Sequence, residues 1–145
     1  MFRVVCFAVL CILPTVFAKA DTRATEQKNL ARFEQFAGPP VESFDMWSMY
    51  QWQSLGPDRL AVWSAVNKVW LLKVSQPCIR LEDTNAIKIT SQMTHKVTAR
   101  FDYVDFAAQH CQIQEIRPVD YLAMRKAGRP AKTNGELGAQ DPGAT

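Results

Sequence analysis

The stretch YQWQSLGPDRLAVWSAVNKVWLLKV, residues 50–74, has the clearest strand pattern of the chain. It contains most of three apolar segments that two tight turns separate, which is the pattern of an antiparallel meander. The segments are residues 48–55, 59–65 and 69–74, and the turns are Gly56-Pro57-Asp58 and Val66-Asn67-Lys68. Because the third segment is nearly all apolar, we expect a strand that is buried on both faces or covered by a helix.

Three more strands are predicted downstream, over residues 86–91, 96–101 and 111–116. In the last of them Cys111 and Ile113 are in phase and Ile116 is out of phase, which indicates a bulge. The segment that carries Asp102 and Asp105, after the fifth strand, is expected to be a loop.

A helix is predicted on each side of these strands. Residues 21–37 place apolar side chains at helical spacing, with Thr25 as the expected cap and Gly38 at the end. Downstream, Pro118 suits the first turn of a short helix that ends at Gly128. The predicted fold class is mainly β (α+β), an antiparallel sheet or small open barrel of about six strands with a short helix at each end.

The first twenty residues have the layout of a cleavable secretory signal. Arg3 precedes the apolar run 4–17, and Ala18-Lys19-Ala20 offers small residues for cleavage after Ala20, with cleavage after Ala18 as the alternative. An uncleaved membrane anchor is the other interpretation, although about 14 apolar residues are few for a bilayer. We expect a periplasmic or secreted protein with no stable membrane anchor after cleavage.

The remaining chain divides into a single β-rich domain at 21–127 and a tail at 128–145. The tail holds four glycines and two prolines, and Leu137 is its one sizeable apolar residue, so we expect it to be disordered. Removing the signal leaves 15 basic against 14 acidic residues, a net charge of +1, since Arg3 and Lys19 belong to the signal. This balance gives no indication of a nucleic-acid partner.

Two cysteines, Cys78 and Cys111, lie outside the signal. In an oxidising compartment they most simply form one disulfide, and a closed loop of 33 residues would stabilise the fold by about 3.7 kcal/mol. A zinc site that also used His95 and His110 is an alternative, as is a reactive Cys111 thiol. Both are disfavoured because His110 and Cys111, adjacent on a strand, point to opposite faces.

Several of these motifs together resemble a family of small exported bacterial proteins that is catalogued as a domain of unknown function. The motifs are residues 50–63, 70–74, Cys78, 89–91 and 111–120, and the resemblance covers roughly residues 33–120. It implies the export signal and the paired cysteines, and it implies no activity and no site residues.

Motifs of known enzymes are absent from the sequence, which has no GxSxG, HExxH, GxxxxGK[ST] or GxGxxG. No cofactor and no metal are expected. Asp102 and Asp105 could act as a general acid and base or as calcium ligands, but solvated turn charges explain them better. The alternative function that we keep is a small envelope hydrolase or cell-wall enzyme that uses Asp102, Asp105 or His110.

Large aromatic side chains are concentrated in the first three strands. They are Trp47, Tyr50, Trp52, Trp63 and Trp70. Because they alternate between both faces of the predicted sheet, one interpretation buries all of them in the core or under the helices. The other places some of them on a surface that binds a partner.

Arg117 also has two interpretations. Its planar guanidinium could hold a carboxylate ligand, or it could pair with Asp58 or Glu115 while Asp120 caps the last helix. The candidate binding surface is therefore Tyr50, Trp52, Trp63 and Arg117. The predicted function is a non-catalytic binding or interaction module of the bacterial envelope, whose partner is an envelope protein or a glycan.

Overall fold

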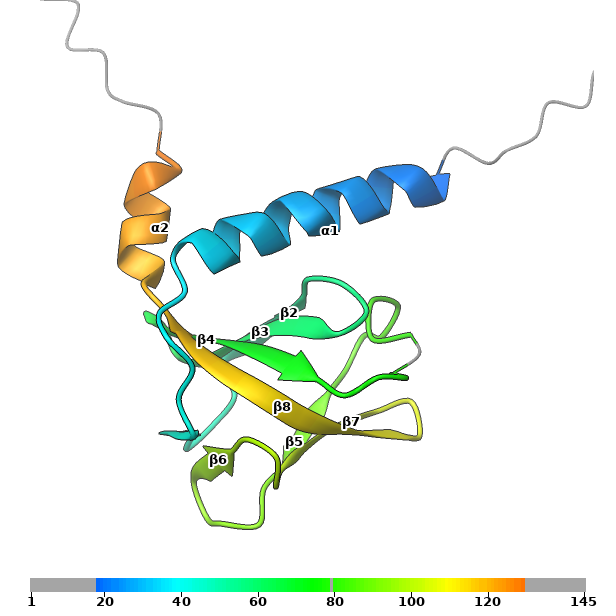
Figure 1. Ribbon diagram of the computed structural model, residues 1–145, viewed down its shortest axis with the longest axis vertical. Helices are drawn as coiled ribbons and strands as arrows, with labels where there is room; N and C mark the ends of the chain where they lie inside the picture. Colours follow the sequence, from blue (N-terminus) through cyan, green and yellow to red (C-terminus); the bar gives the residue numbers. More distant parts are fainter. Residues whose placement is uncertain (1–17, 79, 130–145) are drawn as a thin grey trace, which may run out of the picture.

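The computed structural model describes residues 18–78 and 80–129. It places one helix near each end of a run of short strands (Figure 1). In chain order the elements are α1 (Ala18–Gln35), β1 (Ser43–Asp45), β2 (Gln51–Ser54), β3 (Arg59–Ala65), β4 (Lys68–Val74), β5 (Lys88–Thr90), β6 (Lys96–Thr98), β7 (Tyr103–Phe106), β8 (Gln109–Val119) and α2 (Tyr121–Ala127).

Six strands form one antiparallel sheet, in the order β2-β3-β4-β8-β7-β5, which curls into a half-barrel. The remaining strands, β1 and β6, pair with each other in a separate two-stranded ribbon. In Figure 1 this ribbon lies at the end of the molecule opposite α1 and α2. The expected mainly β, antiparallel architecture with a helix near each end is confirmed.

Alternation along the strands gives the sheet an apolar core on each face. In β4, Leu72 and Val74 join the inner core, which also contains Leu60, Val104 and Ile113. Val69 and Leu71, which occupy the alternate positions of the same strand, join an outer core under the helices. The nearly all-apolar strand therefore packs on both faces, as its sequence predicts.

The outer core attaches the two helices to the sheet. Trp63 of β3 is its central side chain and is 3% exposed. Its ring makes edge-to-face contacts with Phe33 of α1, at 5.9 Å between centroids, and with Tyr121 of α2, at 5.6 Å. Met124 adds the buried face of α2. One tryptophan thus contacts both helices.

The predicted bulge in the last strand is present at Gln114. Lys73 pairs with Glu115 whereas Val74 pairs with Ile113, so β8 has one extra residue at this point. The insertion shifts the phase of the strand. Cys111, Ile113 and Ile116 consequently all reach the inner core.

Two predictions about strands are wrong. The strand expected over residues 96–101 stops at Thr98 and continues as a turn, because Arg100 adopts φ 69° and the Asp102 N–H donates back to the Thr98 carbonyl. The expected loop around Asp105 is strand β7, which lies between β5 and β8 in the sheet. Its polar side chains face outward while Val104 and Phe106 are buried. Polar and apolar residues therefore alternate as in any half-buried strand, although the aspartates suggest a loop.

Two predictions about helix ends are also wrong. Thr25 does not cap α1, which begins at Ala18, and its hydroxyl donates to the Asp21 carbonyl within the helix. Pro118 belongs to β8 and pairs with Trp70. The closing helix α2 begins after Asp120, whose carboxylate accepts a hydrogen bond from the Ala123 N–H, so the predicted cap is confirmed.

Cys78 and Cys111 form the expected disulfide, which is buried in the inner core. Gln76 links it to the β2–β3 turn, because its Nε2 donates to the Pro57 carbonyl and its Oε1 accepts from the Cys78 N–H. Most of the predicted signal and tail, residues 1–17 and 130–145, lie outside the described residues. Neither helix in the described part of the chain has the length and apolar character needed to cross a bilayer.

Candidate functional site

The predicted aromatic surface is divided by the fold. Tyr50 is 64% exposed, whereas Trp52 is half-buried and packs against the inner core. Trp63 is buried under the helices, so placing it on a binding surface is wrong. The alternation of the strand explains the division, because Trp52 lies opposite Val62 on the inner face whereas Trp63 points to the outer face.

Arg117 stabilises a loop and does not pair with Asp58 or Glu115. Its Nε donates to the Gly38 carbonyl at 2.8 Å, and its Nη2 lies 3.5 Å from the Ala37 carbonyl. These contacts hold the segment after α1 against β8. Two of the three guanidinium nitrogens are therefore engaged with the backbone.

Asp102 is buried at 1% exposure and organises the turn after β6. Its carboxylate accepts hydrogen bonds from the Thr98 N–H at 2.7 Å, the Gln92 N–H at 2.9 Å and the Ser91 hydroxyl at 3.1 Å. Three donors satisfy the buried charge. Asp102 thus positions the backbone.

Asp105 and His110 face each other across the β7–β8 pair, and the His110 Nδ1 is hydrogen-bonded to the Asp105 carboxylate. The Thr90 hydroxyl donates to the same carboxylate, and the Tyr103 ring stacks on the imidazole at 3.9 Å. Burial acts to raise the pKa of Asp105, but hydrogen bonds from Thr90 and His110, with the charges of His110 and Lys88, lower it overall.

The pair lies on an open part of the outer face, where the His110 side chain is 59% exposed. Asp102 does not join it, because its three partners belong to the β5–β6 loop and to β6. The three residues named for an enzyme therefore do not meet in one cleft. The two cysteines bond to each other, so neither the zinc alternative nor the reactive thiol has a free thiolate.

Trp47 is the most exposed large apolar side chain of the described residues, at 78%. Its ring stacks on the His95 imidazole with 3.9 Å between centroids and 19° between planes. The Met46 N–H donates to the His95 carbonyl, which ties the two loops together at the end of the β1–β6 ribbon. We call Trp47 and His95 the Trp47 platform.

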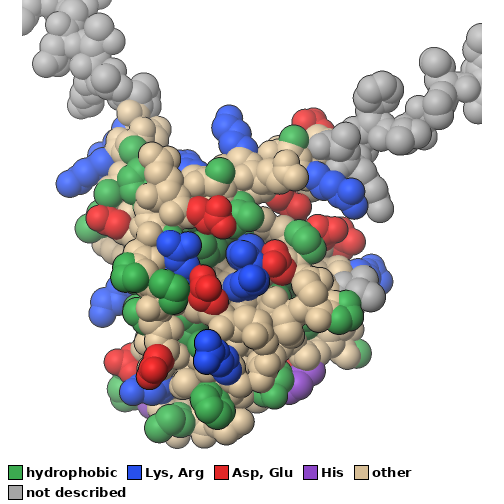
Figure 2. Space-filling view, in the orientation of Figure 1, with side chains coloured by type: hydrophobic (Ala, Val, Ile, Leu, Met, Phe, Trp, Pro, Cys, Tyr) green, Lys and Arg blue, Asp and Glu red, His purple; other side chains and the backbone are tan. Residues whose placement is uncertain are grey.

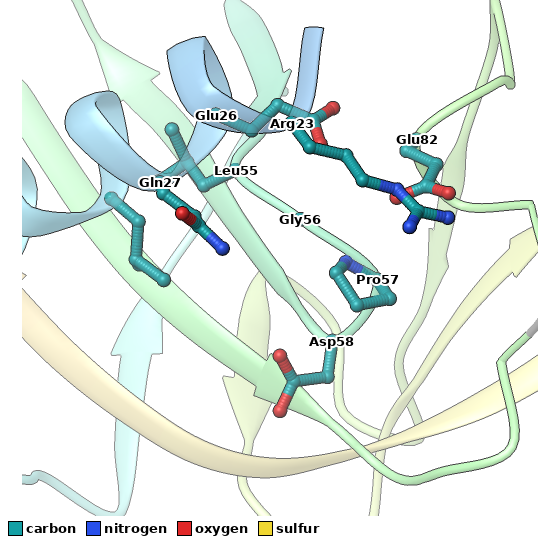
Figure 3. A pocket seen from close by; sticks show the side chains of 9 residues that line it. Arg23, Glu26, Gln27, Leu55, Gly56, Pro57, Asp58 and Glu82 are labelled. Atoms are coloured by element: carbon teal, nitrogen blue, oxygen red, sulfur yellow. The ribbon is translucent and has the colours of Figure 1, made fainter. Parts of the chain in front are cut away.

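One cavity, of about 500 Å³, lies between α1 and the β2–β3 turn. Figure 3 shows Arg23 extending from α1 toward Glu82, with Glu26 on the same helix and the Gly56-Pro57 turn beneath. Burial raises the pKa of Glu26, and the negative charges of Glu82 and Asp83 add to this effect against Arg23. The excess of carboxylates disfavours an anionic ligand here.

A second cavity, of about 460 Å³, crosses β8 near its bulge. Its walls are residues 40–42 and 98–101, and its floor is Gln114 and Glu115. Phe101, which is 60% exposed, forms part of one wall. We call this cavity the Phe101 groove. On the face of the molecule that Figure 2 shows, acidic and basic side chains are interspersed, and neither sign forms a broad patch.

Comparison with known proteins gives a family and no activity. A family model described as a family of unknown function (DUF6491) matches residues 1–135. The chain belongs to this family. No curated protein and no solved structure matches the chain.

Membership of DUF6491 confirms the resemblance to a family of unknown function. It adds no site residues, so the candidate surfaces rest on the geometry alone. The predicted binding surface does not include Trp47, although the sequence places it among the clustered aromatic residues. The Phe101 groove has no signal in the sequence, because its walls are more than fifty residues apart and approach each other only through strand pairing.

Proposed function

We propose that this protein is an exported, non-catalytic binding module of the bacterial envelope that contacts its partner through the Trp47 platform. The observation that carries the proposal is the 78% exposure of Trp47, although its ring stacks on the His95 imidazole. A large aromatic ring held rigidly at the surface costs little conformational entropy when it binds.

Several features support a protein partner at this platform. Tryptophan, tyrosine and methionine are enriched in protein–protein interfaces. Met93, two residues before His95, is 59% exposed. Tyr50 is also exposed, three residues after Trp47. The platform could instead bind a glycan, and the experiment below distinguishes a glycan partner from a protein partner.

Export is supported by two observations of different kinds. The N-terminal sequence has the charged, apolar and small-residue parts of a secretory signal. The Cys78–Cys111 disulfide persists most readily in an oxidising compartment. The test is the intact mass of the protein recovered from the envelope fraction, with and without reduction and alkylation. A chain that begins at Asp21 and has no free thiol is expected, and a chain that retains Met1 or has two free thiols would contradict export.

A hydrolase that uses Asp105 and His110 is the second candidate, because the two side chains form a hydrogen-bonded pair. General-base catalysis by this histidine would need a nucleophile or a bound water beside its Nε2. The ring contacts of His110 are with Asp105 and Tyr103, on an open strand surface. This setting favours a structural pair over a catalytic one.

The binding proposal is tested by capture of partners from envelope extract with the tagged mature protein after chemical cross-linking. Trp47→Ala removes a side chain outside both cores, so the fold is kept and capture of the partner is expected to fall about tenfold. Val66→Ala is the matched control, because Val66 is exposed to 57% in the β3–β4 turn and does not belong to the platform. Equal capture by wild type and Trp47→Ala would overturn the proposal, and capture of saccharide alone would exclude a protein partner.

A further inference from the structure

The Phe101 groove is preformed, because backbone hydrogen bonds fix both of its walls to β8. The Val41 N–H donates to the Ile116 carbonyl at 2.8 Å, and the Arg100 N–H donates to the Ile113 carbonyl at 2.6 Å. The walls also bond to each other through the Ala99 N–H and the Glu42 carbonyl. A ligand would therefore enter a site that needs little reorganisation.

The groove carries charged side chains that have no partner within the described part of the protein. Among the described residues, the side chains of Glu42, Arg100 and Glu115 have no hydrogen-bond partner and no ion-pair partner. Two carboxylates and one guanidinium supply acceptors and donors around one cavity. The exposed Phe101 ring adds an apolar surface beside them.

The wall that carries Arg100 and Phe101 is held in an uncommon conformation. Arg100 has φ 69°, in the left-handed region that side chains other than glycine and asparagine rarely adopt. The buried Asp102 carboxylate and the Gln112 amide, which donates to the Arg100 carbonyl, hold the turn in place. Such conformations persist where the surrounding structure fixes them, and they cluster at binding sites.

We propose that the Phe101 groove binds a neutral saccharide unit. The apolar C–H face of a pyranose packs on the Phe101 ring. Its hydroxyl groups both donate and accept, so they can satisfy the Glu42 and Glu115 carboxylates and the Arg100 guanidinium together. A cavity of about 460 Å³ has the size of small-molecule sites and accommodates one or two sugar rings.

The charges of the groove disfavour an anionic ligand, because its two carboxylates outnumber the one guanidinium. A neutral saccharide has no charge of its own to desolvate when it enters the groove. A zwitterionic peptide fits the signs of the charges but makes less use of the aromatic wall. This site is separate from the Trp47 platform, because the groove lies at the Glu42 and Thr98 end of the β1–β6 ribbon and the platform lies beyond Asp45 and Lys96.

The experiment is a titration of the ¹⁵N-labelled mature protein with chitotriose, cellotriose and maltotriose at millimolar concentrations, and with glycylglycine as the zwitterionic probe. At least one trisaccharide is expected to shift the amide signals of residues 40–42, 98–101 and 114–115 in a saturable way. Phe101→Ala is expected to weaken this binding about tenfold. Arg100→Gly is expected to weaken it as well, while the glycine relieves the left-handed backbone and keeps the fold.

Two control variants separate this site from the platform. Met93→Ala and Trp47→Ala remove exposed side chains outside the groove and are expected to leave saccharide affinity unchanged. The inference is overturned if no trisaccharide shifts the groove amides, if glycylglycine binds there instead, or if Phe101→Ala and Arg100→Gly both bind like the wild type. The dispersion of the same spectra shows that each variant is folded.

Discussion

The inner and outer faces of the curled sheet differ in how they are covered. The inner face is closed by the sheet itself, by the β1–β6 ribbon and by the buried disulfide, and its core is almost entirely apolar. The outer face is covered by α1 and α2 only over β3, β4 and the end of β8, where Trp63 meets both helices. Its other part is open and carries polar side chains such as Tyr103 and His110. Neighbouring residues of one strand thus belong to two cores that are closed by different elements.

The largest predicted effect belongs to the inner face. Replacing both Cys78 and Cys111 by alanine opens a loop of 33 residues and is expected to lower the free energy of unfolding by about 4 kcal/mol. Urea denaturation of the double variant and the wild type measures it. The wild type under reducing conditions is the control, since it should approach the double variant. A loss below about 1 kcal/mol would show that the inner core does not depend on the disulfide.

The adjacent residues Leu71 and Leu72 test the two faces directly, because they differ in face and share strand, residue type and burial. Leu72→Ala leaves a cavity in the inner core and is expected to cost about 4 kcal/mol, with loss of protection in the whole sheet. Leu71→Ala is expected to cost about 2 kcal/mol, because the helices can shift toward the cavity.

Hydrogen exchange distinguishes the two leucine variants. In Leu71→Ala the amides of α1 and α2 are expected to exchange faster while those of β7 and β8 keep their protection. In Leu72→Ala all of these amides are expected to exchange faster together. Identical exchange patterns in the two variants would mean that the two faces unfold as one unit. The inner and outer cores would then not differ in the free energy of local unfolding.

The parts of the fold that could be predicted are those where local pattern and tertiary packing agree. β3 and β4 have clear turns at their ends and are apolar over most of their length, so the sequence predicts their bounds closely. β7 alternates too, but Asp102 and Asp105 suggested a loop. The β7–β8 turn was not predicted because Ala107 and Ala108 give no turn signal, although both have positive φ.

The candidate sites could be predicted only in part. The number of aromatic residues leaves both burial and exposure open, and which ring is exposed depends on where the helices lie. The sequence therefore does not show that Trp63 is buried and Trp47 exposed. The contacts of Arg117 with the Ala37 and Gly38 carbonyls join segments some eighty residues apart. No local pattern encodes such a contact, since it arises from the path of the chain after α1.

The β7–β8 hairpin, in the open part of the outer face, provides a smaller test. Ala108 has φ 62°, which is unfavourable for an L-residue with a Cβ. Ala108→Gly is therefore expected to raise the free energy of unfolding by about 1 kcal/mol. Ala65→Gly, at an exposed strand position without positive φ, is the matched control and is expected to be destabilising. Destabilisation by Ala108→Gly would show that the turn is not strained.

The smallest effect is expected at Asp105, which also lies in the open part. Because its pKa is lowered from the ordinary value of 3.8, the folded protein holds this proton less tightly than the unfolded chain. The carboxylate thus stabilises the fold above pH 3.8, and this contribution is lost as the pH falls through the lowered pKa. Asp105→Asn is expected to cost less than about 1 kcal/mol near neutral pH, because His110 is largely solvated.

The pH dependence shows whether the loss of stability in Asp105→Asn comes from the ionised carboxylate. In denaturation curves from about pH 7 to about pH 2, the difference between wild type and Asp105→Asn is expected to be constant down to the ordinary aspartate pKa and then to shrink. Asp45→Asn, at an exposed aspartate of β1 that has no side-chain partner among the described residues, is the matched control for the loss of one carboxylate. A difference that persists at the lowest pH would assign the cost to lost packing against Thr90 and not to the ionised pair. The open half of the outer face would then be stabilised by its side-chain contacts, in the same way as the half that lies under the helices.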